Sequence, residues 1–175
     1  MANLHNGAAV TGYRSFCLCL TFVAISCRPA TPPELSDQQR AAIADSVRGH
    51  LGELATWMSA QGAGRAFPTF FDSAPGFVQA ADGRVTSASF DSLAARYRSW
   101  APPAGARLTW DTVRVEPLGP GLAHFTGTFT ESFTPPTGQP YEGHGVMSGV
   151  AVRRPGGWRI AAVHTSVVPP ATPGR

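Results

Sequence analysis

The chain has 175 residues and a formal net charge of +3, with a sequence pI of about 9.1. This length suits one domain and is enough for an apolar core that needs neither metals nor disulfides. A net charge of this size does not by itself exclude any class of function. The arginines are scattered, however, and no aromatic residues alternate with them, so we expect no nucleic-acid binding.

Residues 1–27 predict a signal peptide that ends at a lipid-attachment site. Residues 15–26 are mostly apolar and lie between Arg14 and Cys27. They are too few to cross a bilayer as a helix, which takes about 20 residues, and they suit the apolar region of a signal peptide. The ending Val-Ala-Ile-Ser-Cys resembles a bacterial lipobox, in which the cysteine is acylated. We therefore expect an exported protein of the cell envelope, anchored to a membrane at Cys27 on the periplasmic or extracellular face. The alternative is an ordinary secretory signal with an incidental cysteine.

Proline-rich segments flank the rest of the sequence. Residues 28–35 predict an extended linker, and residues 169–175 predict a disordered tail. The folded domain is then expected at residues 36–168. No cysteine follows Cys27, so this domain has no disulfide, no thiol nucleophile and no cysteine ligand for a metal.

The first half of this domain predicts three helices. Ser36 and Gln39 form a capping-box pattern, and the apolar residues that follow recur at helical spacing until glycine ends the helix near residue 62. The phenylalanines at 67–71 indicate a short second helix. After an Asp-Gly pair at 82–83, which is a strong hairpin signal, Thr86 or Ser87 can cap a third helix that ends before the prolines at 102–103.

The second half changes to the period of two that is typical of strands. Alternation is clear at 122–133, 144–152 and 158–166, and these segments are joined by short turns or loops. At 108–115 the alternation shifts by one residue, which indicates a β-bulge. Helices that precede an antiparallel sheet predict an α+β fold.

The order of these elements resembles the SnoaL-like, nuclear transport factor 2-like superfamily. The similarity covers about residues 36–168, and its best motif is the Gly-Gly-Trp-Arg-Ile stretch at 156–160, followed by His164 and Ser166. The resemblance implies a cone-shaped fold, in which a strongly curved sheet wraps around three N-terminal helices and encloses a pocket. It also implies that the domain often forms a dimer.

Two residues are candidates for catalysis. His164 shares the alternation phase of Trp158 and Ile160, so we expect it to face the pocket, where burial can tune a general base; the alternative is a hydrogen-bonded core histidine. Asp72 is the second candidate, because in ketosteroid isomerase-like members of this superfamily an aspartate base works with a tyrosine donor in an apolar pocket. Asp72 also suits a simple turn. No Tyr–Asp pair can be placed in the pocket.

The residues expected to line the pocket are Trp57, Tyr97, Phe125, His144, Ser148 and His164. For Trp57 and Tyr97 the alternative is core packing, and for His144 it is a position in solvent at the end of a strand. No histidine pair has metal-ligand spacing, so we expect neither a metal nor a cofactor.

Three functions stay open from the sequence. The favoured function is the binding of a small apolar ligand in the conical pocket, because residues for a catalytic pair are missing. The alternatives are an isomerase- or cyclase-like enzyme and a homodimeric interaction module.

Overall fold

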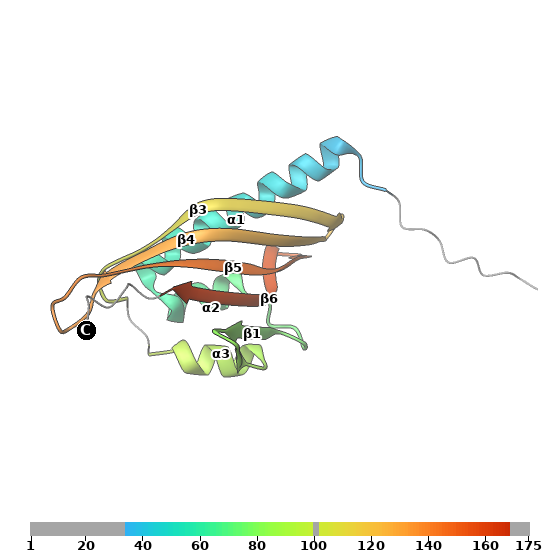
Figure 1. Cartoon of the computed structure of the whole chain (residues 1–175). Helices are drawn as coiled ribbons and strands as arrows, with labels where there is room; N and C mark the ends of the chain where they lie inside the picture. Colours follow the sequence, from blue (N-terminus) through green and yellow to red (C-terminus); the bar gives the residue numbers. More distant parts are fainter. Residues whose placement is uncertain (1–33, 100–101, 169–175) are drawn as a thin grey trace, which may run out of the picture. The chain divides into compact units, whose positions relative to one another are not determined.

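The computed structural model of the protein describes residues 34–99 and 102–168 (Figure 1). The helices are α1 (Asp37–Gln61), α2 (Ala63–Phe70) and α3 (Phe90–Tyr97). The strands are β1 (Val78–Ala81), β2 (Arg84–Ser87), β3 (Ala104–Gly119), β4 (Leu122–Thr134), β5 (Tyr141–Arg154) and β6 (Gly157–Val168). They form one six-stranded sheet in the order β2-β1-β6-β5-β4-β3. The expected α+β fold is confirmed.

Neighbouring strands of the sheet are antiparallel except at one place. Strand β1 runs parallel to β6, with Ala80 opposite His164, so the sheet is mixed rather than purely antiparallel. The hairpin between β1 and β2 turns at the predicted Asp-Gly pair, and both Asp82 (φ 47°) and Gly83 (φ 78°) have the left-handed backbone that this turn needs.

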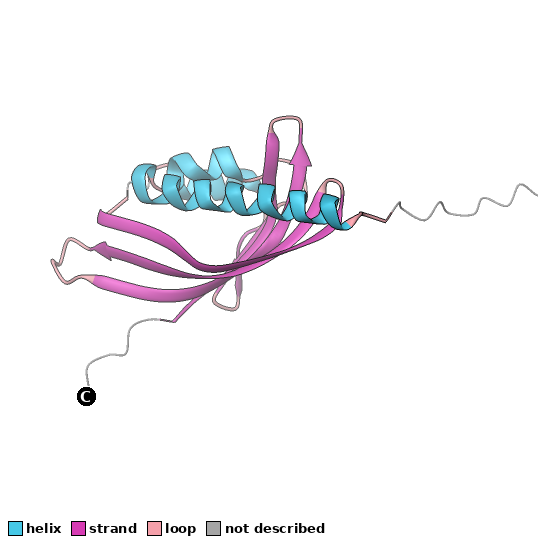
Figure 2. Cartoon of the chain, turned by 90° about the horizontal axis from the view of Figure 1, so that it is seen from above, coloured by secondary structure: helices cyan, strands magenta, loops and turns pink. Residues whose placement is uncertain are grey.

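The helices lie against one face of the curved sheet (Figure 2). The predicted capping box starts α1: the Ser36 N–H donates to Gln39 Oε1 at 2.8 Å, and the Gln39 N–H donates to Ser36 Oγ at 3.2 Å. The start of α3 differs from the expectation, because Ser89 caps it in place of Thr86 or Ser87. Those two residues lie in β2, where Ser87 pairs with Gln79 of β1.

Aromatic rings lie over glycines on the inner face of the sheet. Phe125 and Phe129 of β4 stand opposite Gly149 and Gly145 of β5. A Cβ on either glycine would overlap the ring beside it, and a Cβ on Gly127 would lie 2.8 Å from the ring of Trp110. Glycine is therefore required here for space, and the rings fill the concave side of the sheet.

The strand pairing shifts register at several places, and two of these β-bulges, one in the middle of β3 and one in β6, bear on the predicted alternation of side chains. The bulge predicted in β3 is confirmed, because the pairing with β4 shifts between Trp110 and Thr112. A second bulge lies in β6, where Val150 pairs with Ala162 but Ala151 pairs with Ile160. Trp158 and Ile160 are buried as expected. After the bulge the alternation is shifted by one residue, so that Val163 is the next buried residue of β6.

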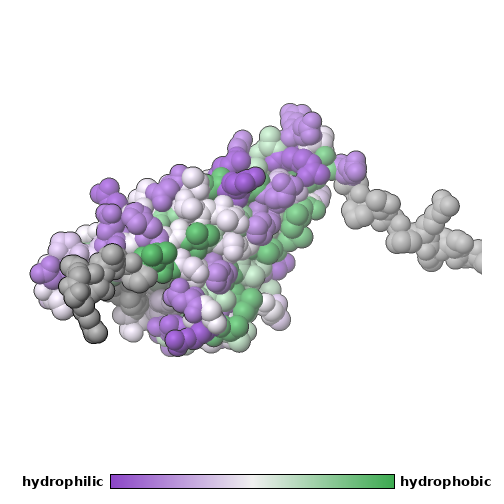
Figure 3. Space-filling view, in the orientation of Figure 1, coloured by the Kyte–Doolittle hydropathy of each residue, from purple (hydrophilic) through white to green (hydrophobic). Residues whose placement is uncertain are grey.

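The surface mixes polar and apolar side chains without one extended apolar face in the view of Figure 3. Among the described residues, the large hydrophobic side chains that are exposed lie on one helix and five different strands, at Trp57, Val85, Leu118, Leu122, Val146 and Val168. Among the described residues, no helix has the length and apolar character needed to cross a membrane.

Candidate functional site

A cavity of about 250 Å³ lies between the helices and the concave face of the sheet. Helices α1 and α2 contribute Met58 and Phe67 to its wall, and strands β5 and β6 contribute Met147 and Val163. The rings of Phe71 and Tyr97 each pack edge-on against Phe67, with centroids 4.6 Å apart. Most of the cavity wall is therefore apolar, and rigid rings form one side of it.

Few polar side chains reach the cavity. Gln79 of β1 is buried, and its amide oxygen accepts a hydrogen bond from the Thr86 hydroxyl at 3.2 Å. Asp82 and Glu131 supply two carboxylates, and Tyr97 and Thr165 supply hydroxyl groups. The Val167 N–H donates to Asp82 Oδ1 at 3.3 Å, which ties the hairpin turn to the end of β6.

Glu131 is an acidic residue in the wall of this cavity. It is half-buried on β4, and burial raises the pKa of its carboxyl group above the usual value. The hydroxyl of Tyr141 donates to Glu131 Oε1 at 3.4 Å, which partly opposes that effect. Burial, followed by the negative charge of Glu131, raises the pKa of Tyr141 in turn. A carboxyl group with a raised pKa beside a phenol can hold or donate a proton at the cavity wall.

Sequence reasoning missed Glu131, although the sequence contains a signal for it. On β4, every second residue faces the core: Phe125, Gly127 and Phe129 are buried there, and Glu131 is the next residue on the same face. A carboxylate in the apolar phase of a strand is costly to bury, so it marks a place where function is expected.

Of the three predicted pocket residues on the helices and β4, one lines the cavity and two do not. Tyr97 lines the cavity. Phe125 is fully buried in the core over Gly149, and is not among the residues that line the cavity. Trp57 is 39% exposed and lines a different hollow on α1.

The three predicted residues of β5 and β6 do not line the cavity. His164 is exposed, because the bulge at residue 161 places it in the outward phase of β6. His144 is also exposed, and Ser148 shares its phase. The sequence analysis assumed that the valines of β5 face the core. In the structure Val146 is 43% exposed, and Gly145 and Gly149 of β5 face the core beneath Phe129 and Phe125 of β4.

Asp72, the second catalytic candidate, is held in an ion pair away from the cavity. The guanidinium of Arg154 donates to its two carboxylate oxygens, at 3.2 Å from Nε and at 2.5 Å from the terminal nitrogen. This hydrogen bonding is the main cause that lowers the pKa of Asp72. The Ala74 N–H also donates to Asp72 Oδ1 at 3.4 Å, which fits the alternative of a turn residue.

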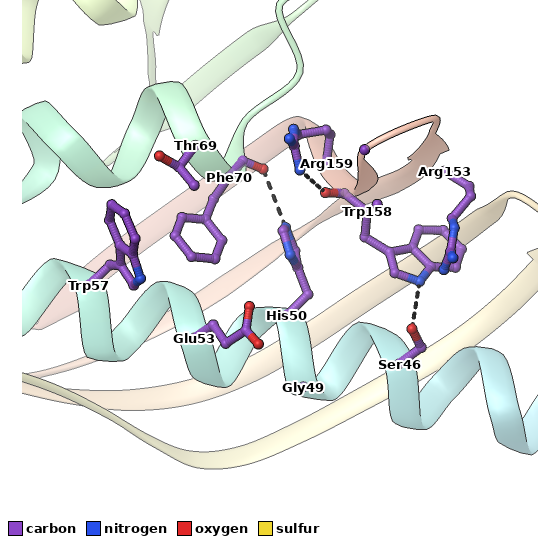
Figure 4. Close-up of a pocket in the computed structure, with 12 residues that line it drawn as sticks. Ser46, Gly49, His50, Glu53, Trp57, Thr69, Phe70, Arg153, Trp158 and Arg159 are labelled. Atoms are coloured by element: carbon purple, nitrogen blue, oxygen red, sulfur yellow. Dashed lines mark hydrogen bonds between the residues drawn. The ribbon is translucent and has the colours of Figure 1, made fainter.

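A second hollow of about 480 Å³ lies between α1, α2 and the β5–β6 turn (Figure 4). The indole N–H of Trp158 donates to Ser46 Oγ at 3.0 Å and closes one end of it. His50 lies near its centre, with Nε2 at 3.4 Å from the carbonyl oxygen of Phe70. Burial is the main cause that lowers the pKa of His50. This hollow shares no lining residue with the apolar cavity.

No group of three or more His, Cys, Asp or Glu side chains that could hold a metal ion occurs within residues 34–99 and 102–168.

Residues 47–170 match the family model of the SnoaL-like domain. No curated protein sequence matches the chain. Several solved structures are similar in fold. A nuclear transport factor 2-like superfamily protein from Salmonella enterica is 17% identical, with a TM-score of 0.56, and the match covers 78% of this chain and 94% of that one.

Two further solved structures are similar in fold. The association domain of C. elegans CaMKII is 17% identical, with a TM-score of 0.60 over 75% of this chain and 99% of that one. A protein from Catenulispora acidiphila in complex with S-DNPA is 15% identical, with a TM-score of 0.57 over 73% and 95% of the two chains. At these identities the likeness shows the fold alone.

Proposed function

Because the chain belongs to the SnoaL-like domain family, we propose that it binds a small, largely apolar molecule in the cavity between its helices and its curved sheet. The observation that carries this proposal is the composition of the cavity wall. Apolar and aromatic side chains form most of it, and only a few polar groups enter, which is how ligand-binding cavities are usually built. A fold neighbour determined in complex with S-DNPA supports the same use of the fold.

An isomerase- or cyclase-like enzyme is a second candidate, which Glu131 favours. Its pKa is raised by burial at the cavity wall, as a general acid or base requires. Catalysis needs two titratable groups within reach of one reacting atom. Tyr141, the hydrogen-bonded partner of Glu131, is not among the lining residues, so ligand binding stays the better-supported function.

The proposal also covers the cellular location of the protein. Cys27 and the signal segment lie outside the described residues, as do most of the 28–35 linker and the 169–175 tail. We propose that the protein is exported and anchored to a membrane of the cell envelope through a lipid on Cys27. The proposal rests on the apolar segment that ends in this cysteine.

A homodimer through the outer face of the sheet is a further proposal. Thr126 and Ser148 form a cross-strand pair on that face, and Val146 is 43% exposed beside it. Short side chains let two sheets approach each other closely. The likeness to an association domain supports this arrangement.

Ligand binding is tested with the neutral fluorescent probe N-phenylnaphthylamine. We expect saturable binding to the purified domain, and we expect Met147→Trp to abolish it because the larger side chain fills the cavity. Val146→Trp is the matched control, since the neighbouring residue of the same strand points outward and should leave binding unchanged. Circular dichroism checks that both variants fold. Probe binding that is absent, or that is insensitive to Met147→Trp, would contradict the proposal.

A further inference from the structure

The charged side chains that line the apolar cavity all have the same sign. Asp82 and Glu131 are both carboxylates, and no arginine or histidine is among the lining residues. The composition of the chain makes this notable, because the protein as a whole carries more basic than acidic residues. The inside of the cavity is therefore negative in a protein whose net charge is positive.

Neither carboxylate has a cationic partner within the described residues. The four ion pairs in this part of the chain use Glu116, Asp45, Glu142 and Asp72. Asp82 accepts only the Val167 N–H, and Glu131 accepts only the Tyr141 hydroxyl, at 3.4 Å. Each carboxylate keeps hydrogen-bonding capacity for a further donor.

The two carboxylates line the same cavity. The Tyr141 hydroxyl donates to Glu131, and burial, then the negative charge of Glu131, followed by the weaker effect of Asp82, raise the pKa of Tyr141. Glu131 on β4 and Asp82 in the β1–β2 turn both line the cavity, and strands β6 and β5 lie between them in the sheet. The rings of Phe67 and Phe71 form an apolar part of the wall. Asp82 is exposed, whereas Glu131 is half-buried with only a neutral donor beside it, so a bound cation would offset the cost of burying the charge of Glu131.

We propose that the ligand of this cavity is a small amphiphilic amine, whose apolar body packs against the aromatic wall and whose ammonium group binds Glu131, while the exposed Asp82 adds a second negative charge to the wall. This inference rests on the proposed function. An ammonium group supplies three donors and a positive charge, and both match what the two carboxylates lack. A ligand with a carboxylate or a phosphate would instead meet two like charges at the cavity wall.

The test compares three compounds that share one body and differ in their polar end: phenylbutylamine, phenylbutanol and phenylbutyrate. Each is titrated against the domain loaded with N-phenylnaphthylamine. We expect the amine to displace the probe at about a tenth of the alcohol concentration or less, because a charge-assisted hydrogen bond replaces a neutral one. The carboxylate should be the weakest of the three.

Variants of the two acidic residues test whether they cause the preference for the amine over the alcohol. Glu131→Gln should reduce the affinity for the amine about tenfold and leave that for the alcohol unchanged. Asp82→Asn combined with Glu131→Gln should abolish the preference, and asparagine tolerates the left-handed backbone at position 82. Glu53→Gln is the matched control, because Glu53 lines the other hollow and its loss should change nothing.

The outcomes separate this inference from the proposed function. If the probe binds the cavity but the amine displaces it no better than the alcohol, the inference is wrong and the proposed function stands. A preference for the amine that survives the double variant also overturns the inference. If the probe does not bind in a Met147-dependent way, the proposed function itself fails.

Discussion

Asp72 and Arg154 join the α2–β1 connection to the end of β5. The Asp72 side chain is 9% exposed and that of Arg154 is 45% exposed, so solvent screens the pair on one side only. The Asp72 N–H also donates to the Ile160 carbonyl oxygen at 2.8 Å, beside the bulge of β6. The residue that the sequence offered as a possible base therefore holds two parts of the fold together.

We predict that Asp72→Asn lowers the free energy of unfolding by about 1–2 kcal/mol at pH 7, the lower range for a hydrogen bond to a charged group because Arg154 is half-exposed. The folded-state pKa of Asp72 is lowered, so its stabilisation is present above the unfolded pKa of about 4 and is lost as the pH falls through the folded pKa. Urea denaturation at pH 7 and in acid measures this.

The exposed pair of Asp45 and Arg48 on α1 provides the control, and Asp45→Asn should change stability by less than about 0.5 kcal/mol. A difference between wild type and Asp72→Asn that stays constant down to strongly acidic pH would contradict the linkage to this carboxyl group.

The residues of the cavity wall differ in how clearly the sequence predicts their position. Helical spacing placed Tyr97 on an apolar stripe, with core packing as the alternative to the pocket, and Tyr97 lines the cavity. Glu131 stands in a visible alternation, and its phase would have identified it. Gln79 lies on a strand whose parallel pairing with β6 depends on contacts distant in sequence, so no local pattern could place it in the cavity.

At the level of elements, the two bulges explain why one strand was predicted correctly and another was not. In β3 the bulge lies between Trp110 and Val113, whose apolar side chains change phase visibly. In β6 it lies in the pair Ala161-Ala162, where small side chains suit either face and hide the change. His164, three residues later, was consequently assigned to the wrong side of the sheet.

Helix α1 has a glycine at position 49 that packing does not require. A Cβ at Gly49 would meet nothing within 4 Å, and glycine inside a helix costs about 0.5–1 kcal/mol relative to alanine. We therefore predict that Gly49→Ala raises the free energy of unfolding by about that amount, measured by chemical denaturation.

The same substitution at Gly149 should have the opposite sign. There a Cβ would meet the Ala162 carbonyl oxygen and the ring of Phe125, and overpacking of this kind costs about 1–3 kcal/mol. Equal effects of Gly49→Ala and Gly149→Ala on stability would contradict the view that only the glycines of the sheet are needed for space.

For the molecule as a whole, the sequence predicted the fold class and the order of its elements. The capping box of α1, the Asp-Gly hairpin and the alternation of β4 are local patterns, and the structure contains all three. The placement of β1 beside β6, and therefore the closure of the cavity, depends on pairing between segments about eighty residues apart. That pairing has no signature in a single sequence.

The last prediction concerns the attachment of the domain to a membrane through Cys27, which lies outside the described residues. An acylated N-terminal cysteine of a bacterial lipoprotein carries two or more chains, which is enough for stable anchoring where a single chain binds only reversibly. In bacterial cells that export the protein, we expect the wild type in the membrane fraction and Cys27→Ser in the soluble fraction. Cys19→Ser makes the same chemical change inside the apolar segment and should leave the protein on the membrane. Mass spectrometry of the N-terminal peptide should show an acylated Cys27, and a soluble wild-type protein with an unmodified N-terminus would leave only the ordinary secretory signal.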